Sequence, residues 1–199
     1  MHRLAGCQEH GLRFMMAKAL LNVRKNNPRV VLNRFLVKSE IAREMTLHEQ
    51  ITKLRAFYRK QKPTVKAKED YVDITMGALL DENLERVFQY LKLLYPGEVI
   101  ASIYEEMLDG RSSSDTRAHA VELLANTVEP DLLMMIQSTL TDGGLVRWKD
   151  REIRAILQAF MQSQDQWFTL IALYLATDLN LKERWPEISE SQGPFSTNA

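Results

Sequence analysis

A helical segment recurs three times along this chain of 199 residues. Residues 88–94 read Phe-Gln-Tyr-Leu-Lys-Leu-Leu, residues 118–124 read Ala-His-Ala-Val-Glu-Leu-Leu, and residues 168–174 read Phe-Thr-Leu-Ile-Ala-Leu-Tyr. Asp115 and Asp165 stand shortly before the second and third copies, where a helix N-cap would lie. A recurring helix with a second helix packed behind it is typical of an α-solenoid, a fold that builds surfaces and not reaction centres.

Apolar residues recur at helical spacing through most of the chain, and no segment alternates apolar and polar residues between strand turns. The sequence therefore predicts an all-α fold. We interpret Trp148, Trp167 and the pair Met134–Met135 as packing residues. Four stripes predict which side chains face the core: Leu12, Met15, Met16, Ala19, Leu20 and Val23; Val121, Leu124, Ala125 and Val128; Ile153, Ile156, Leu157, Phe160 and Met161; and Trp167, Leu170, Ile171, Tyr174 and Leu175.

Three parts are expected along the chain. The sequence Gln-Lys-Pro-Thr at 61–64 interrupts the helical pattern, because proline cannot continue a helix. We expect a basic helical part over residues 1–62 and about three helical-hairpin units over residues 63–181. Residues 182–199 are polar and contain Ser and Pro, which predicts a disordered tail.

The net charge of zero conceals a strong polarity. Residues 1–68 hold 16 Lys and Arg against 4 Asp and Glu, a net charge of +12, and residues 69–199 hold 10 against 22, a net charge of −12. In a solenoid the two parts would meet only near Pro63, which would leave the far basic helices exposed. Either the two parts attract each other, or the basic residues only solvate the outer sides of helices, or the basic part offers a surface to nucleic acid, an anionic membrane or an acidic partner. The candidate anion-binding residues are Arg24, Lys25, Arg29, Arg55, Arg59, Lys60 and Lys62.

Motifs for catalysis or metal binding are not found in the sequence. His48-Glu49 begins like a zinc-protease helix, but position 52, where the second imidazole should stand, is threonine. The Gly-Gly pair at 143–144 lacks the spacing and the Lys of a phosphate-binding loop. We therefore expect no enzyme activity, no catalytic, metal-binding or cofactor-binding residues and no cofactor. The single cysteine and the absence of a signal-peptide apolar region predict a cytoplasmic protein.

Two segments carry a resemblance to a known family. Residues 86–98 read Arg-Val-Phe-Gln-Tyr-Leu-Lys-Leu-Leu-Tyr-Pro-Gly-Glu, and residues 117–124 read Arg-Ala-His-Ala-Val-Glu-Leu-Leu. They resemble the HEAT-like helical domain of some bacterial membrane proteins, where it lies on the cytoplasmic side of a major-facilitator or nucleotide-translocase-like transporter core. The resemblance implies a HEAT-like α-solenoid with an interaction or regulatory role and no catalytic residues.

Two functions follow as expectations. The first is a non-enzymatic HEAT-like module that binds a protein partner and is linked to a membrane transporter, in the cytoplasm or at the inner face of the membrane. The alternative is a nucleic-acid-binding helical-repeat protein that uses the basic first third, where Phe57 and Tyr58 stand beside Arg55, Arg59 and Lys60. The same basic residues would also suit a membrane surface.

Overall fold

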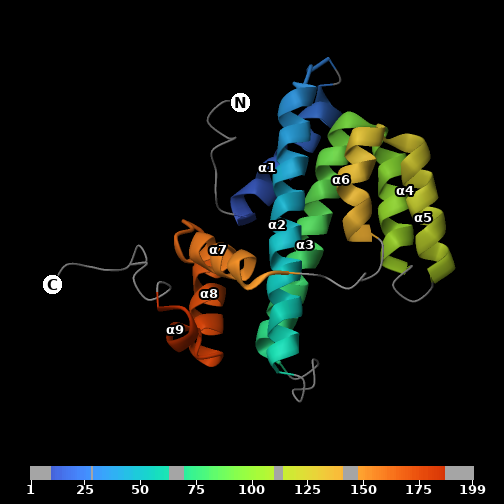
Figure 1. Ribbon diagram of the computed structural model, residues 1–199. Coiled ribbons are helices and arrows are strands. Elements are labelled where there is room, and N and C mark those ends of the chain that lie inside the picture. The colour runs from blue at the N-terminus through green and yellow to red at the C-terminus, as the bar shows by residue number, and fades with distance from the viewer. Residues whose placement is uncertain (1–9, 28, 63–69, 110–113, 141–147, 187–199) are drawn as a thin grey trace. The chain divides into compact units, whose positions relative to one another are not determined.

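A computed structural model describes residues 10–27, 29–62, 70–109, 114–140 and 148–186 (Figure 1). All regular secondary structure in these ranges is helical, which confirms the all-α prediction. Within them, no helix is both long enough and apolar enough to cross a membrane. The helices are α1 (His10–Asn26), α2 (Arg34–Gln61), α3 (Tyr71–Leu94), α4 (Gly97–Asp109), α5 (Ser114–Thr127), α6 (Pro130–Leu140), α7 (Asp150–Met161), α8 (Gln166–Asp178) and α9 (Leu181–Arg184).

Aspartate side chains cap two of these helices. Before α3, Asp70 Oδ1 accepts a hydrogen bond from the Val72 N–H at 2.9 Å, and before α8, Asp165 Oδ1 accepts one from the Trp167 N–H at 3.0 Å. The Asp165 cap confirms the sequence prediction. Asp115 lies inside the first turn of α5 and not before it, where its charge still complements the positive end of the helix dipole.

The chain divides into two compact units, and both α2 and α3 contribute to each unit. The boundaries of the two units differ from the expected division between residues 62 and 63, because segments far apart in sequence pack together within each unit. Unit 1 comprises residues 1–6, 11–49 and 81–144, and unit 2 comprises residues 7–10, 50–80 and 145–199.

Unit 1 has a core built by α1, α4, α5, α6 and parts of α2 and α3. In this unit α5 packs against both α4 and α6. Leu124 is fully buried, as the sequence predicts, whereas Leu123 is half-buried and Ala125 is exposed. The core includes Ala17, Val37, Ile41, Met45, Val87, Phe88, Leu91, Ile100, Ile103, Leu124, Leu132 and Ile136.

Unit 2 places α8 against both α7 and α9. All five residues of the stripe predicted between Ile153 and Met161 are buried, which confirms that stripe. The Trp185 ring stacks on the Phe57 ring, with 6.0 Å between centroids and an interplanar angle of 27°. The expectation of a disordered tail is therefore wrong at its start, because residues 182–184 are helical and Trp185 is buried. Residues 187–199 lie outside the described residues.

The three copies of the recurring segment are helical but are not buried alike. Tyr90 and Ala120, at the third position of the first two copies, are both buried, whereas Leu170 in the third copy is exposed. The seventh position behaves in the same way, since Leu94 and Leu124 are buried and Tyr174 is exposed. The third copy therefore packs through a different face, and a solenoid arrangement stays a prediction.

Candidate functional site

Helix α8 is apolar on two opposite faces, and only one of them is packed. Phe168, Ile171 and Leu175 are buried, and the Phe168 ring lies 4.8 Å from the Phe160 ring of α7. The other face leaves Trp167, Leu170, Leu173 and Tyr174 exposed. The predicted stripe of this helix is therefore right for Ile171 and Leu175 and wrong for Trp167, Leu170 and Tyr174. Met134 and Met135, which we interpreted as core or inter-repeat packing residues, are exposed on α6.

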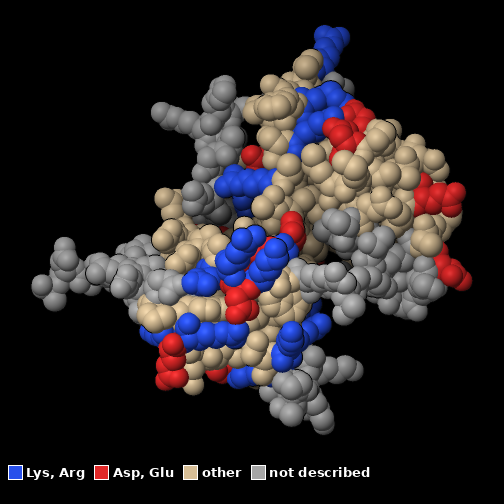
Figure 2. Space-filling view, in the orientation of Figure 1, with Lys and Arg blue, Asp and Glu red and all other residues tan. Residues whose placement is uncertain are grey.

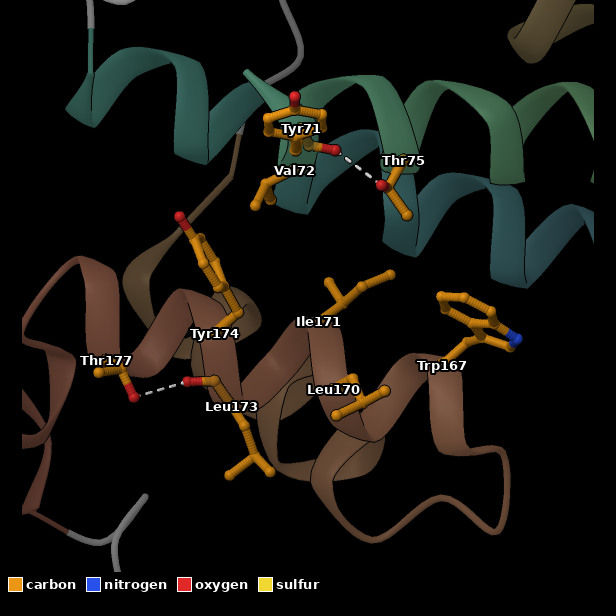
Figure 3. A pocket seen from close by; sticks show the side chains of 9 residues that line it. All are labelled: Tyr71, Val72, Thr75, Trp167, Leu170, Ile171, Leu173, Tyr174 and Thr177. Carbon is orange, nitrogen blue, oxygen red and sulfur yellow. Dashed lines mark hydrogen bonds between the residues drawn. The ribbon is translucent and has the colours of Figure 1, made fainter. Parts of the chain in front are cut away.

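The exposed face of α8 forms one wall of an open apolar groove, and the first turns of α3 form the other (Figure 3). Figure 3 shows Tyr71 and Val72 of α3 opposite Ile171 and Tyr174 of α8. The groove has a volume of about 510 Å³. Its lining residues all belong to unit 2: Tyr71, Val72, Thr75, Trp167, Leu170, Ile171, Leu173, Tyr174 and Thr177.

The polar groups of the groove are largely engaged within their own helices. Thr75 Oγ1 donates to the Tyr71 carbonyl oxygen at 2.6 Å, and Thr177 Oγ1 donates to the Leu173 carbonyl oxygen at 2.9 Å. None of the nine lining residues carries a charge. The groove therefore offers apolar side chains to a ligand, with the tyrosine hydroxyls and the Trp167 N–H as its polar atoms.

A buried carboxylate holds the α3 wall of the groove against α2. Asp73, in the first turn of α3, accepts two hydrogen bonds from Arg55 and two from Arg59, at 2.6–2.9 Å. The Arg55 guanidinium passes so close to α3 that a Cβ on Gly77 would lie 3.0 Å from its Nη2, so the absence of a side chain there permits the contact. Tyr58 adds a hydrogen bond to Asp70 at 2.7 Å.

The ion pairs of Asp73 with Arg55 and Arg59 predict that the free energy of unfolding falls in acid. Burial raises the pKa of Asp73, but the hydrogen bonds and charges of Arg55 and Arg59 outweigh it and lower the pKa from 3.8 to about 2. Because the pKa is lower in the folded chain, the charge of Asp73 stabilises the fold at pH values above about 3.8. This stabilisation is lost as the pH falls through about 2. We expect Asp73 to contribute roughly 2 kcal/mol at pH 5 and little at pH 2.

Urea unfolding of the natural chain and of Asp73→Asn over this pH range measures the contribution. The difference in free energy of unfolding between the two should shrink as the pH falls. A difference that stays constant down to about pH 2 would contradict the role given to the charge of Asp73.

The seven candidate anion-binding residues fall in both units. Arg24, Lys25 and Arg29 belong to unit 1, and the other four belong to unit 2. In unit 2, Arg55 and Arg59 bind Asp73, Lys62 binds Asp178, and the Lys60 Nζ lies 5.5 Å from the centroid of the Trp148 ring.

Basic and acidic parts of the chain pair at several places. In unit 1, Arg34 and Lys38 both bind Glu129, and Lys38 also lies 3.0 Å from Asp131. The prediction that the two parts meet only near Pro63 is therefore wrong. Much of the basic charge is neutralised inside the fold, which favours the interpretation that the two parts attract each other.

Unit 1 contains a buried charged cluster that sequence reasoning missed. Glu44 Oε2 accepts hydrogen bonds from Arg86 Nε at 3.0 Å and Asn83 Nδ2 at 2.7 Å, and Glu44 Oε1 lies 3.2 Å from Arg13 Nε. These residues come from three helices, and each alone looks like an ordinary polar residue of a solvent-facing helix side. No local sequence signal marks the cluster.

His48, which begins the rejected zinc-protease motif, lies beside this cluster. Its Nδ1 is 3.0 Å from Asn83 Oδ1, and burial lowers the pKa of the imidazole. Throughout the part of the chain that the structure describes, no group of three His, Cys, Asp or Glu side chains is arranged to hold a metal ion.

The groove in unit 2 is therefore the strongest candidate for a functional site. No family model, curated protein or solved structure matches the chain.

Proposed function

We propose that this protein is a non-enzymatic interaction module whose groove between α3 and α8 binds one amphipathic helix of a partner protein. The observation that carries the proposal is the second apolar face of α8. A helix that is apolar all round is normally buried on all sides, and α8 has 13 residues, too few for the roughly 20 that cross a bilayer. A helix of a partner protein would cover its outer face.

The size of the exposed surface fits a single helix. Tyr71, Trp167 and Tyr174 are 84%, 56% and 49% exposed. At roughly 200 Å² for each aromatic side chain, they leave about 400 Å² of aromatic surface in water. With Leu170 and Leu173, the patch is about as large as the largest apolar patch of a typical monomer, which is often functional, and it stays below the roughly 800 Å² per partner of a standard protein interface. One bound helix would cover it, whereas a stable dimer needs more.

The spacing of the groove residues also fits a helix. Trp167, Leu170 and Tyr174 stand at positions i, i+3 and i+7 and extend over two turns of α8. A groove of this length receives side chains that recur at the same interval on a partner helix. Aromatic residues in such a position supply much of the binding energy, because they bury large areas and lose little conformational freedom.

A library of displayed helical peptides, selected against the full chain, tests the proposal. We expect the selected peptides to carry apolar residues at i, i+3 or i+4, and i+7. Leu170→Asp should weaken their binding by about tenfold or more, because it places a carboxylate in an apolar groove. The matched control is Leu12→Asp, since Leu12 is 52% exposed and Leu170 58%, and Leu12 belongs to unit 1.

Peptide affinities measured by fluorescence polarisation on the natural chain and both variants decide the outcome. Retained affinity for Leu12→Asp and lost affinity for Leu170→Asp would support the groove. Equal affinities for the two variants, or a selection that yields no peptide with apolar spacing, would overturn it.

Nucleic-acid binding is the alternative proposal and has less support. Its aromatic residues, Phe57 and Tyr58, are both buried, and Arg55 and Arg59 are bound to Asp73. The link to a transporter stays a prediction from the resemblance of residues 86–98 and 117–124.

A further inference from the structure

Helix α1 turns its predicted core face toward solvent. Leu12, Met15 and Val23 are exposed, whereas Arg13 and Ala17 are buried. The prediction for the first stripe is therefore wrong for Leu12, Met15, Ala19 and Val23, whereas Leu20 packs against the core of unit 1. Arg13 lies beside the buried Glu44, and this contact fixes the rotation of α1 about its axis. An apolar helix face is left in water.

The chain around this face is basic throughout. Residues 10–39 contain seven Lys and Arg and no Asp or Glu. Four of the seven have carboxylate partners within unit 1: Arg13, Lys18, Arg34 and Lys38. The other three, Arg24, Lys25 and Arg29, have none among the described residues. Figure 2 shows Lys and Arg side chains at the end of unit 1 where α1 leads into α2.

Exposed apolar residues stand near these three cations in the sequence. The turn after α1, with the Val30 N–H bound to the Asn27 carbonyl oxygen at 3.0 Å, keeps the following residues close to the end of the helix. Val31 is 92% exposed, and Phe35 at the start of α2 is also largely exposed. We call this group the basic apolar end of unit 1: Val23, Arg24, Lys25, Arg29, Val31 and Phe35.

We propose that the basic apolar end of unit 1 binds an anionic lipid surface. Such a surface offers phosphate and other anionic groups to the cations and an acyl boundary to Val23, Val31 and Phe35. A nucleic acid would satisfy the cations and leave the valines in water. Three cations and a few apolar side chains give weak, reversible binding, which salt screens over about 8 Å at ~0.15 M. This surface belongs to unit 1, so the inference is independent of the groove in unit 2.

Sedimentation of the full chain with lipid vesicles tests the inference. We expect binding to mixed phosphatidylcholine and phosphatidylglycerol vesicles at low salt, release at ~0.15 M salt, and no binding to phosphatidylcholine alone. The double variant Lys25→Glu, Arg29→Glu should reduce the partition coefficient onto the vesicles by about tenfold or more. Each cation near an anionic surface raises this coefficient severalfold. The matched control, Lys60→Glu with Lys182→Glu, changes the net charge equally on exposed residues of unit 2 and should retain most of the binding.

Val31→Ser and Phe35→Ser separate lipid from other anions. Both should weaken vesicle binding and leave the circular dichroism spectrum unchanged, because neither side chain is packed. Equal losses in the two charge-reversed pairs would overturn the inference. It would also be overturned if a DNA duplex bound more tightly than the vesicles and Val31→Ser had no effect on either ligand.

Discussion

Replacing Arg86 with methionine is expected to lower the free energy of unfolding by about 3–5 kcal/mol. Arg86 and Glu44 are both almost completely buried, and their hydrogen bond is 3.0 Å long. Without the guanidinium, the buried Glu44 carboxylate loses the hydrogen bond from Arg86 and keeps only Asn83 and Arg13 beside it. The lost hydrogen bond to a buried carboxylate is the main cost, because the methionine retains much of the apolar packing of the arginine stem.

Urea unfolding followed by circular dichroism measures the loss. The matched control is Arg43→Met, because Arg43 lies in α2 and is partly exposed, with its Nη1 3.8 Å from Glu40 Oε2. It should cost less than about 1 kcal/mol, as partly exposed pairs usually do. A triple variant in which Arg13 and Arg86 become Met and Glu44 becomes Leu removes every charge and should be more stable than Arg86→Met alone. A loss below about 1 kcal/mol for Arg86→Met would show that the cluster is hydrated and not buried.

Leu124→Ala is expected to lower the free energy of unfolding by about 2–5 kcal/mol. Leu124 is fully buried in the core of unit 1, to which α4 and α6 contribute Ile103 and Leu132. Truncation removes apolar contacts and leaves a cavity that neighbouring helices fill only in part.

The neighbouring leucine provides the control. Leu123 is half-buried on the same helix, so Leu123→Ala should cost clearly less while changing helix propensity equally. Similar losses for the two substitutions would show that the rotation of α5 about its axis is wrong.

Sequence patterns predict burial reliably where a helix has one apolar face. In α7 the large apolar residues recur at alternating spacings of three and one, and polar residues or alanine occupy the other positions, so the five expected residues are the buried ones. The stripe through Val121, Leu124, Ala125 and Val128 agrees in part, since Leu124 and Val128 are buried and Ala125 is exposed. Hydrophobic periodicity decides the outcome here, because only one rotation of the helix removes the apolar residues from water.

The sequence by itself therefore determined the helical class of this protein, its cap at Asp165, and the buried faces of its amphipathic helices. Tertiary structure alone decided the faces of α1 and α8. In α8 both faces are apolar, so contact with Phe160 of α7 chooses the buried one and leaves the groove. In α1 the buried Arg13 beside Glu44 overrides the apolar stripe. Both candidate surfaces arise at these two helices, because periodicity reports which side chains are apolar, whereas partners distant in sequence decide which of them are covered.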